Sequence, residues 1–332
     1  MIWGLVGAST IAAEHMISAL RSTLDGQIAW VVSSNSDHAE AFAKSNAIQQ
    51  STTDLNTMLN DQSVDAVYIS STNEKHLPQA LAAIAAGKHV LCEKPLAMAV
   101  TDAARMVAAA QAKDVVFATN HHLRNAGSHM AIRDLIATGK VGRVLSMRIY
   151  HAVYLPPHLQ GWRINDAAAG GGVIPDITVH DADTVRFHLG EDPVSVIASA
   201  TSSGMGQGVE DSVMSVWAMP SGAQVFAHES FTHAFAGSGL EIHGTDGSIF
   251  ARNVMTQHPV GEIELVTKAG REPISYIAHN LYNEAVRRFT DAVFGKGTVA
   301  ASGEDGVKSL AVALAVRESA NSSQDVKVDY GA

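Results

Sequence analysis

The stretch IWGLVGASTIAA, residues 2–13, decides the fold of the first half of the chain. A short apolar run ends at Gly7, and an apolar pattern with helical spacing then continues to about Arg21. A strand, a glycine turn and a helix in this order are typical of the first βαβ unit of a dinucleotide-binding domain. In such a unit, the free N–H groups at the start of the helix bind a pyrophosphate.

The glycine motif of this turn departs from the usual G-x-G-x-x-G spacing. Gly7 occupies the first position, Ser9 replaces the second glycine and Ala12 replaces the third. The Ser9 hydroxyl can still donate a hydrogen bond to phosphate, and Ala12 is small enough for the helix and strand to pack closely. A generic tight turn would use the same residues, so this interpretation depends on the rest of the chain.

The second predicted strand, residues 27–33, ends where a dinucleotide-binding domain reads the ribose of its cofactor. NAD-preferring sites usually carry Asp or Glu there, whereas this chain has Ser33 and Ser34, followed by His38. Without an acid at the strand end, a 2′-phosphate is not repelled, and these three side chains can hydrogen-bond to it. The sequence therefore favours NADP over NAD, although Asp37 lies close by and no arginine does.

Strands and helices alternate through the remainder of this half. Strands are predicted at residues 64–71, 89–91 and 115–119, with helices at residues 76–86 and 101–113. This alternation predicts an α/β Rossmann domain, with a doubly wound parallel sheet, over residues 1–122. Ligands bind at the carboxyl ends of the strands in such sheets. The strand ends here are polar, and they carry Ser71, Thr72, Asn73, Glu93, Lys94, Asn120, His121 and His122.

Lys94 is the most informative of these polar residues. It follows a predicted strand and precedes Pro95, which stiffens the turn, so its ammonium group is expected to point into the ligand cleft. There it can polarise a carbonyl or hydroxyl oxygen and lower the pKa of a neighbouring acid. Each polar strand end alone fits an ordinary solvated loop, but their convergence on one edge of the sheet indicates a site.

From residue 193 the periodicity of the sequence changes to alternation. Strands are predicted at residues 144–154, 194–200, 212–219, 223–232, 240–243, 248–251 and 262–267, with a final strand near residues 325–330, and helices are predicted at 125–138, 280–294 and 303–320. The pattern predicts a second, α+β domain over residues 123–332, with a large, mostly antiparallel open sheet. One face is expected to be covered by the first part of this domain. The other would be solvated or meet a partner, giving a monomer or a homo-oligomer through the C-terminal sheet.

The stretch GGGVIPDITVHDADTVRFHLG, residues 170–190, carries the second set of candidate residues. Its three glycines allow close approach to another surface, Pro175 suits the first turn of a helix, and Gly190 suits a helix end. Asp176 and His180 are four residues apart and share one helix face. An imidazole beside a carboxylate is a proton donor or acceptor near neutral pH. The alternative is an ordinary helix whose Asp and His form a polar patch.

Two further sets of residues lie near this helix in the sequence. Trp162 and Arg163 can stack on a ring and neutralise a phosphate, or form a packed surface loop. A metal-dependent hydrolase is suggested by Asp181 and Asp183, which follow His180. These two acids are expected to point away from the Asp176–His180 face, and the sequence has no HExxH or Cys/His cluster, so no metal site is predicted.

Composition limits the classes of partner. The 332 residues are 46% hydrophobic and 17% charged, which is typical of a soluble globular protein with two domains. The net charge of −10 disfavours a nucleic-acid or membrane partner, and no apolar run approaches the roughly 20 residues that span a bilayer. The start lacks a signal-peptide pattern and Cys92 is the single cysteine, so a cytoplasmic protein is expected.

The chain resembles the glucose–fructose oxidoreductase and inositol dehydrogenase family. The marks of that family are a nucleotide turn at the N-terminus, E-K-P after the fifth strand and G-G-G-x-x-x-D-x-x-x-H in the second domain. All three occur here in order, the second at residues 93–95 and the third at residues 170–180. The resemblance covers essentially the full chain, and the last two marks are specific together, whereas the degraded glycine turn is not.

The resemblance implies an oxidoreductase that reduces a sugar ketone with NADPH. It implies catalytic roles for Lys94, Asp176 and His180. In the mechanism we expect, His180 gives a proton to the developing alkoxide, Lys94 stabilises the negative charge, and Asp176 orients His180 or a sugar hydroxyl. The residues implied around the cofactor are Gly7, Ser9, Thr10, Ile11, Ala12, Ser33, Ser34, His38, Ser71, Thr72, Asn73, His76, Glu93, Lys94, Asn120, Trp162, Arg163 and Tyr282.

Three alternatives stay open at this point. The family members most similar in these motifs have an arginine near the 2′-phosphate where this chain has His38, so NADP(H) is expected and NAD(H) use stays open. Another polyol, inositol or dihydrodiol dehydrogenase of the family would use the same groups for an oxidation. A non-catalytic NAD(P)-binding sugar sensor is the third alternative, which the presence of Lys94, Asp176 and His180 together disfavours.

Overall fold

The computed structural model describes residues 1–202 and 204–331 and divides the chain into two compact units. The first unit comprises residues 1–121 and 282–307, and the second comprises residues 122–281 and the chain from 308 onward. The sequence division at residue 122 left residues 282–307 in the second domain, whereas the structure packs them with the first unit. The chain therefore passes between the units at three points, after residues 121, 281 and 307.

The first unit is built on a six-stranded parallel sheet, as the alternation of strands and helices predicted. Its strand order is β3-β2-β1-β4-β5-β6, and the order reverses between β1 and β4. Such a switch point is where doubly wound sheets bind ligands. The strands are β1 (Ile2–Val6), β2 (Gln27–Val32), β3 (Gln50–Thr52), β4 (Ala66–Ile69), β5 (His89–Cys92) and β6 (Phe117–Thr119).

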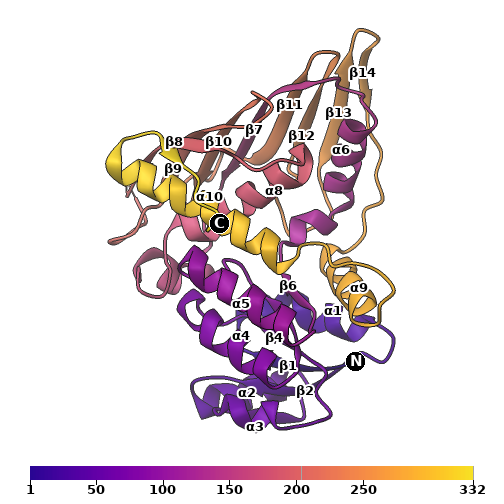
Figure 1. Ribbon diagram of the computed structural model, residues 1–332, viewed down its shortest axis with the longest axis vertical. Helices are drawn as coiled ribbons and strands as arrows, with labels where there is room; N and C mark the ends of the chain where they lie inside the picture. Colours follow the sequence, from indigo (N-terminus) through magenta and orange to yellow (C-terminus); the bar gives the residue numbers. More distant parts are fainter. Residues whose placement is uncertain (203, 332) are drawn as a thin grey trace. The chain divides into compact units, whose positions relative to one another are not determined.

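The helices of this unit follow the predicted pattern, with additions that the sequence did not reveal. The segments α2, α3 and β3 are short and mostly polar, so their periodicity gives little signal. Figure 1 shows α4 and α5 running side by side, and the two helices are in contact. The helical segments are η1 (Ala12–Met16), α1 (Ile17–Ser22), α2 (Ser36–Ser45), α3 (Leu55–Leu59), η2 (Asn73–Lys75), α4 (His76–Ala85), α5 (Val100–Ala112) and most of α9 (Leu281–Val293).

Residues 282–307 complete the core of the first unit. The ring of Phe289 on α9 lies 5.3 Å from the ring of Trp3 on β1, and both side chains are buried. Farther along, the backbone N–H of Thr119 donates to the Ala301 carbonyl at 3.1 Å, and the Thr119 hydroxyl donates to the Ser302 carbonyl at 3.0 Å. These contacts close the β6 edge of the parallel sheet with a segment from far along the chain.

The second unit is built on a nine-stranded sheet, which is mostly antiparallel as predicted. Its order is β14-β13-β12-β11-β7-β10-β9-β8-β15, and within it β7 and β10 run parallel to each other. A final strand expected near residues 325–330 is reduced to two residues, and β14 was not predicted. The strands are β7 (Val144–Ala152), β8 (Ser195–Thr201), β9 (Ser212–Ala218), β10 (Gln224–Ser230), β11 (Ser238–Gly244), β12 (Gly247–Arg252), β13 (Glu262–Thr267), β14 (Gly270–Pro273) and β15 (Val326–Lys327).

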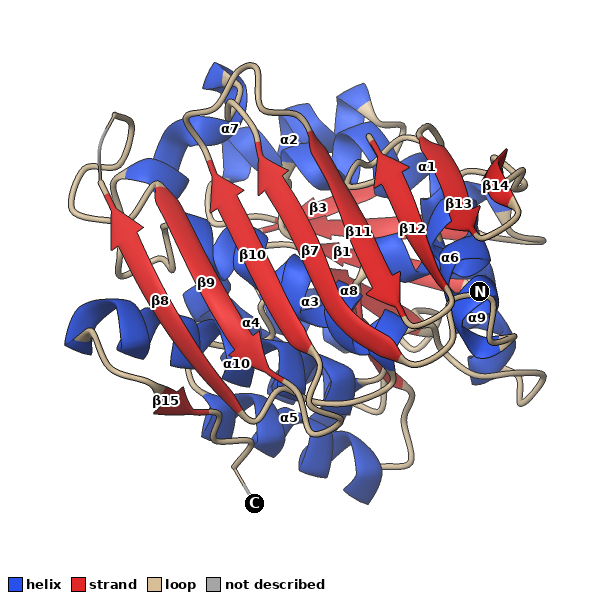
Figure 2. Ribbon diagram, turned by 90° about the horizontal axis from the view of Figure 1, so that it is seen from above, coloured by secondary structure: helices blue, strands red, loops and turns tan. Residues whose placement is uncertain are grey.

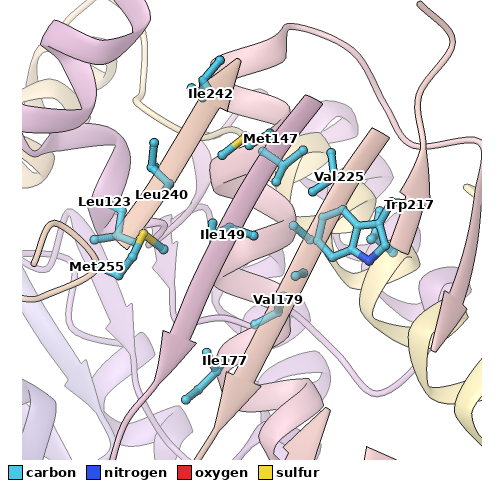
Figure 3. Packing of buried hydrophobic residues seen from close by; sticks show 14 of the residues in the cluster. Leu123, Met147, Ile149, Ile177, Val179, Trp217, Val225, Leu240, Ile242 and Met255 are labelled. Carbon is cyan, nitrogen blue, oxygen red and sulfur yellow. The ribbon is translucent and has the colours of Figure 1, made fainter. Parts of the chain in front are cut away.

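Helices cover one face of this sheet (Figure 2). The main core joins apolar side chains of the strands to Val179 and Val185 of α8 and to Val312 and Val316 of α10. Figure 3 shows part of this core around β7, β10 and β11. The helical segments are η3 (His122–Asn125), α6 (Gly127–Ala137), α7 (Pro157–Gln160), η4 (Gly161–Ile164), η5 (Ile174–Thr178), α8 (Val179–Leu189) and α10 (Gly303–Ser322). Among the described residues, none of the helices combines the length and hydropathy needed to cross a bilayer.

Candidate active site

The turn after β1 requires a glycine because there is no space for a side chain. Gly7 has a φ of +110°, and a Cβ atom there would lie 2.8 Å from the carbonyl carbon of Ser70 and 2.8 Å from the nitrogen of Ser71. The end of β1 therefore approaches the end of β4 backbone to backbone. This approach occurs at the switch point of the sheet, directly before η1, where a dinucleotide pyrophosphate would bind.

Ser9, in place of the second glycine, links this turn to its surroundings. Its hydroxyl accepts a hydrogen bond from the Ala12 N–H at 3.2 Å and lies 2.7 Å from the Ser70 hydroxyl, to which it donates. Ala12 is fully buried, as close packing of the helix requires, whereas Thr10 is exposed and Ile11 is half-buried. The five residues assigned to the nucleotide turn thus form one continuous, internally bonded segment.

The end of β2 brings together the residues assigned to the ribose phosphate. The Ser33 hydroxyl lies 3.3 Å from Nδ1 of His38, and the Asn35 side chain accepts a hydrogen bond from the His38 N–H at 2.9 Å, which caps α2. Ser34 and His38 are exposed. The strand end therefore presents hydroxyl and imidazole groups, and residues 33–36 include no carboxylate.

A hydrogen-bonded cluster lies at the ends of β4, β5 and β6. The Glu93 carboxylate accepts hydrogen bonds of 2.6 Å from the Tyr68 hydroxyl and from Nδ2 of Asn120. Burial raises the pKa of Glu93, while those hydrogen bonds and the ammonium group of Lys94 oppose the rise. Oδ1 of Asn120 is buried and has no hydrogen-bond partner among the described residues. An unsatisfied acceptor at the strand ends fits the donor amide of a nicotinamide.

Two residues assigned to the cofactor are fully buried in the structure. His76 is fully buried, with Nδ1 2.8 Å from the Pro95 carbonyl and Nε2 3.1 Å from the Ser71 carbonyl. Burial also lowers the pKa of His76. Tyr282 is likewise fully buried, with its ring stacked on His15 at 4.7 Å. The structure therefore shows these two side chains packed within the first unit.

The other residues at these strand ends form local hydrogen bonds. The Ser71 hydroxyl donates to Oε1 of Gln79 at 2.6 Å, and the Thr72 hydroxyl donates to Oε1 of Glu74 at 2.7 Å. Asn73 is buried in η2, and Lys94 is half-buried directly after Glu93. The first unit therefore collects, on one edge of its sheet, most of the residues that the sequence assigned to the cofactor.

In the second unit, the three-glycine run passes between two segments that leave no room for side chains. A Cβ atom on Gly171 would lie 2.6 Å from the Trp162 carbonyl oxygen. Gly172 has a φ of +113°, and its Cβ would lie 2.5 Å from Oε1 of Glu210. The Gly172 N–H donates to the Arg163 carbonyl at 2.8 Å, and the Val173 N–H donates to the Glu210 carbonyl at 2.9 Å. The run thereby fixes where the following helical segment begins.

That helical segment places Asp176 beside Arg163. Asp176 lies in η5, a π-helical turn, and such turns are frequent at functional sites. Nε of Arg163 lies 3.5 Å from Oδ1 of Asp176, and the guanidinium group also lies over the Trp162 ring at 4.7 Å. The sequence assigned Arg163 to a cofactor phosphate, whereas in the structure its guanidinium group lies beside the carboxylate of Asp176, a candidate catalytic residue.

His180 lies in the first turn of α8 and is 9% exposed. The ring of His122 meets it edge to face, with 4.8 Å between the ring centroids. The sequence included His122 only as a polar strand end and gave it no role. This part of the second unit thus offers a carboxylate beside a guanidinium, and two imidazoles in contact, which together can donate or accept a proton.

Other charged groups near α8 were not anticipated. Asp181 is fully buried and pairs with His151 of β7, with 3.2 Å between Oδ1 and Nδ1. Asp183 accepts two hydrogen bonds from the Arg124 guanidinium, at 2.7 and 2.8 Å. Sequence reasoning placed both acids away from the Asp176 face but could not identify partners so distant in the chain. Within the described residues, no group of three His, Cys, Asp or Glu side chains could hold a metal ion.

Comparison with protein families gives two matches along the chain. Residues 1–121 match the oxidoreductase family with an NAD-binding Rossmann fold, GFO/IDH/MocA, and residues 129–250 match the GFO/IDH/MocA C-terminal domain. Among curated proteins, the chain is 51% identical over 330 residues to the 1,5-anhydro-D-fructose reductase of Ensifer adhaerens, covering 99% of each chain. It is 31% identical to the inositol 2-dehydrogenase of Rhizobium meliloti, covering 97% and 98% of the two chains.

Solved structures share the fold at lower sequence identity. The aldose-aldose oxidoreductase of Caulobacter crescentus, in complex with glycerol, gives a TM-score of 0.90 at 22% identity and covers 98% of this chain and 99% of its own. A levoglucosan dehydrogenase in complex with NADH and levoglucosan gives a TM-score of 0.88 at 23% identity and covers 99% of each chain. At these identities the structural likeness concerns the fold alone.

Proposed function

Because the chain belongs to the GFO/IDH/MocA family of oxidoreductases, and is an NAD(P)-binding enzyme that acts on sugars, we propose that it reduces 1,5-anhydro-D-fructose. The product would be 1,5-anhydro-D-mannitol, formed by reduction of the ketone at C2 with NADPH. The observation that carries this proposal is the 51% identity to the reductase of Ensifer adhaerens, which extends over 99% of both chains. No large insertion or missing domain separates the two proteins.

The proposed chemistry divides among three residues. The nicotinamide of NADPH supplies the hydride when bound. His180 gives its proton to the oxygen that becomes negatively charged, and the contact with His122 holds the imidazole in place. Lys94 stabilises the developing negative charge, as a fixed cation does in a preorganised site. Asp176, itself paired with Arg163, orients His180 or a sugar hydroxyl.

The preference for NADPH is proposed from the end of β2. Ser33, Ser34 and His38 offer hydrogen-bonding groups and no carboxylate where an NAD-preferring site usually has one. Asp37 is exposed close by, and His38 stands where similar family members have an arginine. We therefore expect NADH to bind more weakly than NADPH without being excluded. Dissociation constants for NADPH and NADH, measured by fluorescence titration, test this preference.

The second candidate function is oxidation of an inositol or another polyol. The inositol 2-dehydrogenase relative favours it, because it is 31% identical over nearly the whole chain. Lys94, Asp176 and His180 could serve either direction, since a proton donor for reduction is a proton acceptor for oxidation. A non-catalytic sugar sensor would have no need of this set, and it would show no turnover with any sugar.

One assay separates these functions. NADPH consumption at its absorbance band is followed with 1,5-anhydro-D-fructose, and NADP⁺ reduction is followed with inositols and related polyols. The proposal predicts rapid consumption with the anhydro sugar and 1,5-anhydro-D-mannitol as the product identified by chromatography. Preferential oxidation of an inositol would instead support the second function, and no turnover at all would support the sensor.

The exposed face of the second unit's sheet supports a further proposal, of self-association. Ile197, Val216 and Phe226 lie side by side on β8, β9 and β10, and each is at least 40% exposed. Met214 on β9 extends the same outward face and is 47% exposed. A row of large apolar side chains across three strands is typical of an interface, so we propose a homo-oligomer formed through this sheet.

A further inference from the structure

The apolar stripes of β7 and β10 end in ionisable side chains. Alternate residues of a strand share one face, and the buried residues Met147 and Ile149 of β7 are followed on that face by His151. On β10, Val225 and Ala227 are followed by Glu229. The two strands run parallel, and their register places His151 opposite Glu229. Figure 3 shows the apolar residues of these stripes, together with Ile177 of η5 and Val179 of α8 from the same core.

Helix α8 adds a second carboxyl group at the same place. Oδ1 of Asp181 lies 3.2 Å from Nδ1 of His151. Asp181 and Glu229 are both 0% exposed, whereas the side chain of His151 is 16% exposed. Three ionisable groups at the end of an apolar core cost free energy unless they pair with one another. The solvent-accessible part of the cluster belongs to the imidazole.

The cluster holds its protons in a definite arrangement. Burial raises the pKa of Glu229 well above its ordinary value, and the charge of Asp181 raises that pKa further. Burial also raises the pKa of Asp181, but the hydrogen bond from His151 opposes the rise. Two buried carboxyl groups that repel each other do not both ionise. Asp181 is the carboxyl group that meets the imidazole, so Asp181 carries the negative charge and Glu229 stays neutral.

The arrangement fixes the tautomer of His151. The Nδ1–H group donates to Asp181, so Nε2 of the neutral imidazole is a hydrogen-bond acceptor in a set orientation. Asp181 directly follows His180 on α8, and the chain leaving β7 leads to Trp162 and Arg163, which contacts Asp176. The cluster is therefore built into the same segments of the second unit that carry the candidate catalytic residues.

We propose that His151 is a sugar-binding and specificity residue, whose Nε2 accepts a hydrogen bond from a substrate hydroxyl that does not react, and that Asp181, supported by Glu229, positions it. This inference rests on the proposed function, because it requires a substrate with several hydroxyl groups. It assigns to these three residues a part in recognition rather than in proton transfer. An acceptor placed to meet a hydroxyl discriminates strongly against an analogue that lacks it, since the buried group is then left unpaired.

The test combines a substitution of His151 with the removal of single hydroxyl groups from the substrate, in the manner of a double-mutant cycle. His151→Asn is the chosen variant because its amide nitrogen can still donate to Asp181 while the Nε2 acceptor is lost. Wild type and variant are compared on 1,5-anhydro-D-fructose and on its monodeoxy analogues. We expect kcat/KM on the parent sugar to fall about 10–100-fold, mainly through KM, with the dissociation constant of NADPH unchanged.

The analogues decide between recognition and a structural role. One deoxy sugar should be a poor substrate for wild type, yet the variant should turn over that analogue and the parent sugar with nearly equal kcat/KM. A variant that discriminates among all analogues as wild type does would overturn the inference. Failure of the proposed function would look different, because wild type would then be inactive on the parent sugar. The same cycle with deoxyinositols and NADP⁺ would still decide the role of His151.

Asp181→Asn is the isosteric variant that tests the supporting carboxylate. It removes the charge that fixes the tautomer of His151, so kcat/KM should fall about tenfold and the discrimination among deoxy sugars should weaken. Wild-type discrimination in Asp181→Asn at an unchanged melting temperature would contradict the assigned role.

Discussion

At the scale of single residues, the tightest demands are made by glycines at close backbone approaches. Gly7 and Gly172 each have a positive φ and a neighbour within 3 Å of where a Cβ would lie. At Gly7 both neighbours are backbone atoms, which cannot move aside as a flexible side chain can. The sequence marked both glycines as functional, but it could not distinguish them from glycines that only end a helix.

We predict that Gly7→Ala costs about 1–3 kcal/mol of stability and weakens NADPH binding at least tenfold, because strain and a clash act together. Gly87→Ala is the matched control in the same unit, since Gly87 also has a positive φ, +76°, but nothing lies within 4 Å of its Cβ position. Thermal melts and fluorescence titration measure both effects. Equal losses in the two variants would show that the close approach to β4 has no importance.

A buried histidine pair governs the response of the second unit to acid. Nδ1 of His129 lies 3.0 Å from Nε2 of His188, and His129 also meets the Val254 carbonyl at 3.1 Å. Both side chains are buried, and burial lowers the pKa of His129 from 6.5 to about 4 and holds the pKa of His188 well below its ordinary value. A pKa below the unfolded value means that stability is complete above pH 6.5 and is lost as the pH falls towards 4.

We therefore expect the melting temperature of wild type to fall between pH 6.5 and 4, in part through this pair. His129→Gln should make that fall shallower, because its amide can still donate to the Val254 carbonyl but does not titrate. Melting curves at several pH values compare the slopes. An unchanged slope in the variant would mean that His129 is not protonated on unfolding in this range.

At the scale of elements, two π-helical turns stand at the two candidate sites. η1 follows the nucleotide turn, and η5 carries Asp176, and each continues directly into an α-helix. The apolar spacing after Gly7 predicted the first helix to about Arg21, and Pro175 and Gly190 predicted the limits of the second. The sequence could not predict the π-helical openings, because five residues are too few to show a period different from that of an α-helix. Nor could it show that Arg163 meets Asp176.

Arg163 of η4 has two candidate roles, and a single variant distinguishes them. If its main partner is Asp176, Arg163→Met should lower kcat about tenfold and leave the NADPH-to-NADH affinity ratio unchanged, because the carboxylate loses its orientation. If it instead neutralises the 2′-phosphate, the variant should lose NADPH affinity selectively. Steady-state kinetics and titrations with both cofactors separate the two outcomes, and a selective loss of NADPH affinity would contradict the role inferred from the 3.5 Å pair.

At the scale of the whole molecule, the two sheets and the enzyme family were predictable from sequence. Alternation of strands and helices determined the parallel sheet, and the later period of two determined the other. The packing of residues 282–307 with the first unit was not predictable, because it depends on contacts such as Phe289 with Trp3 across most of the chain. The same limit hid the pairing of His151 with Asp181 and Glu229, whose members come from three separate elements.

The outward row of apolar side chains predicts self-association in solution. Val216→Glu places a charge at the centre of the row, between Ile197 and Phe226, and should dissociate an oligomer into smaller species. Leu24→Glu is the control, because Leu24 is 91% exposed in the other unit and lies outside this sheet. Light scattering after size-exclusion chromatography gives the masses. A wild-type monomer, or an oligomer unaffected by Val216→Glu, would exclude this interface.

His180→Asn tests whether His180 supplies the proton when a sugar ketone is reduced. The measurement is NADPH consumption with 1,5-anhydro-D-fructose by wild type and variant, together with the dissociation constant of NADPH. If His180 is the proton donor, the variant loses about 10²–10⁴-fold in kcat and binds NADPH as wild type does. Near-normal turnover by the variant would show that another group supplies the proton.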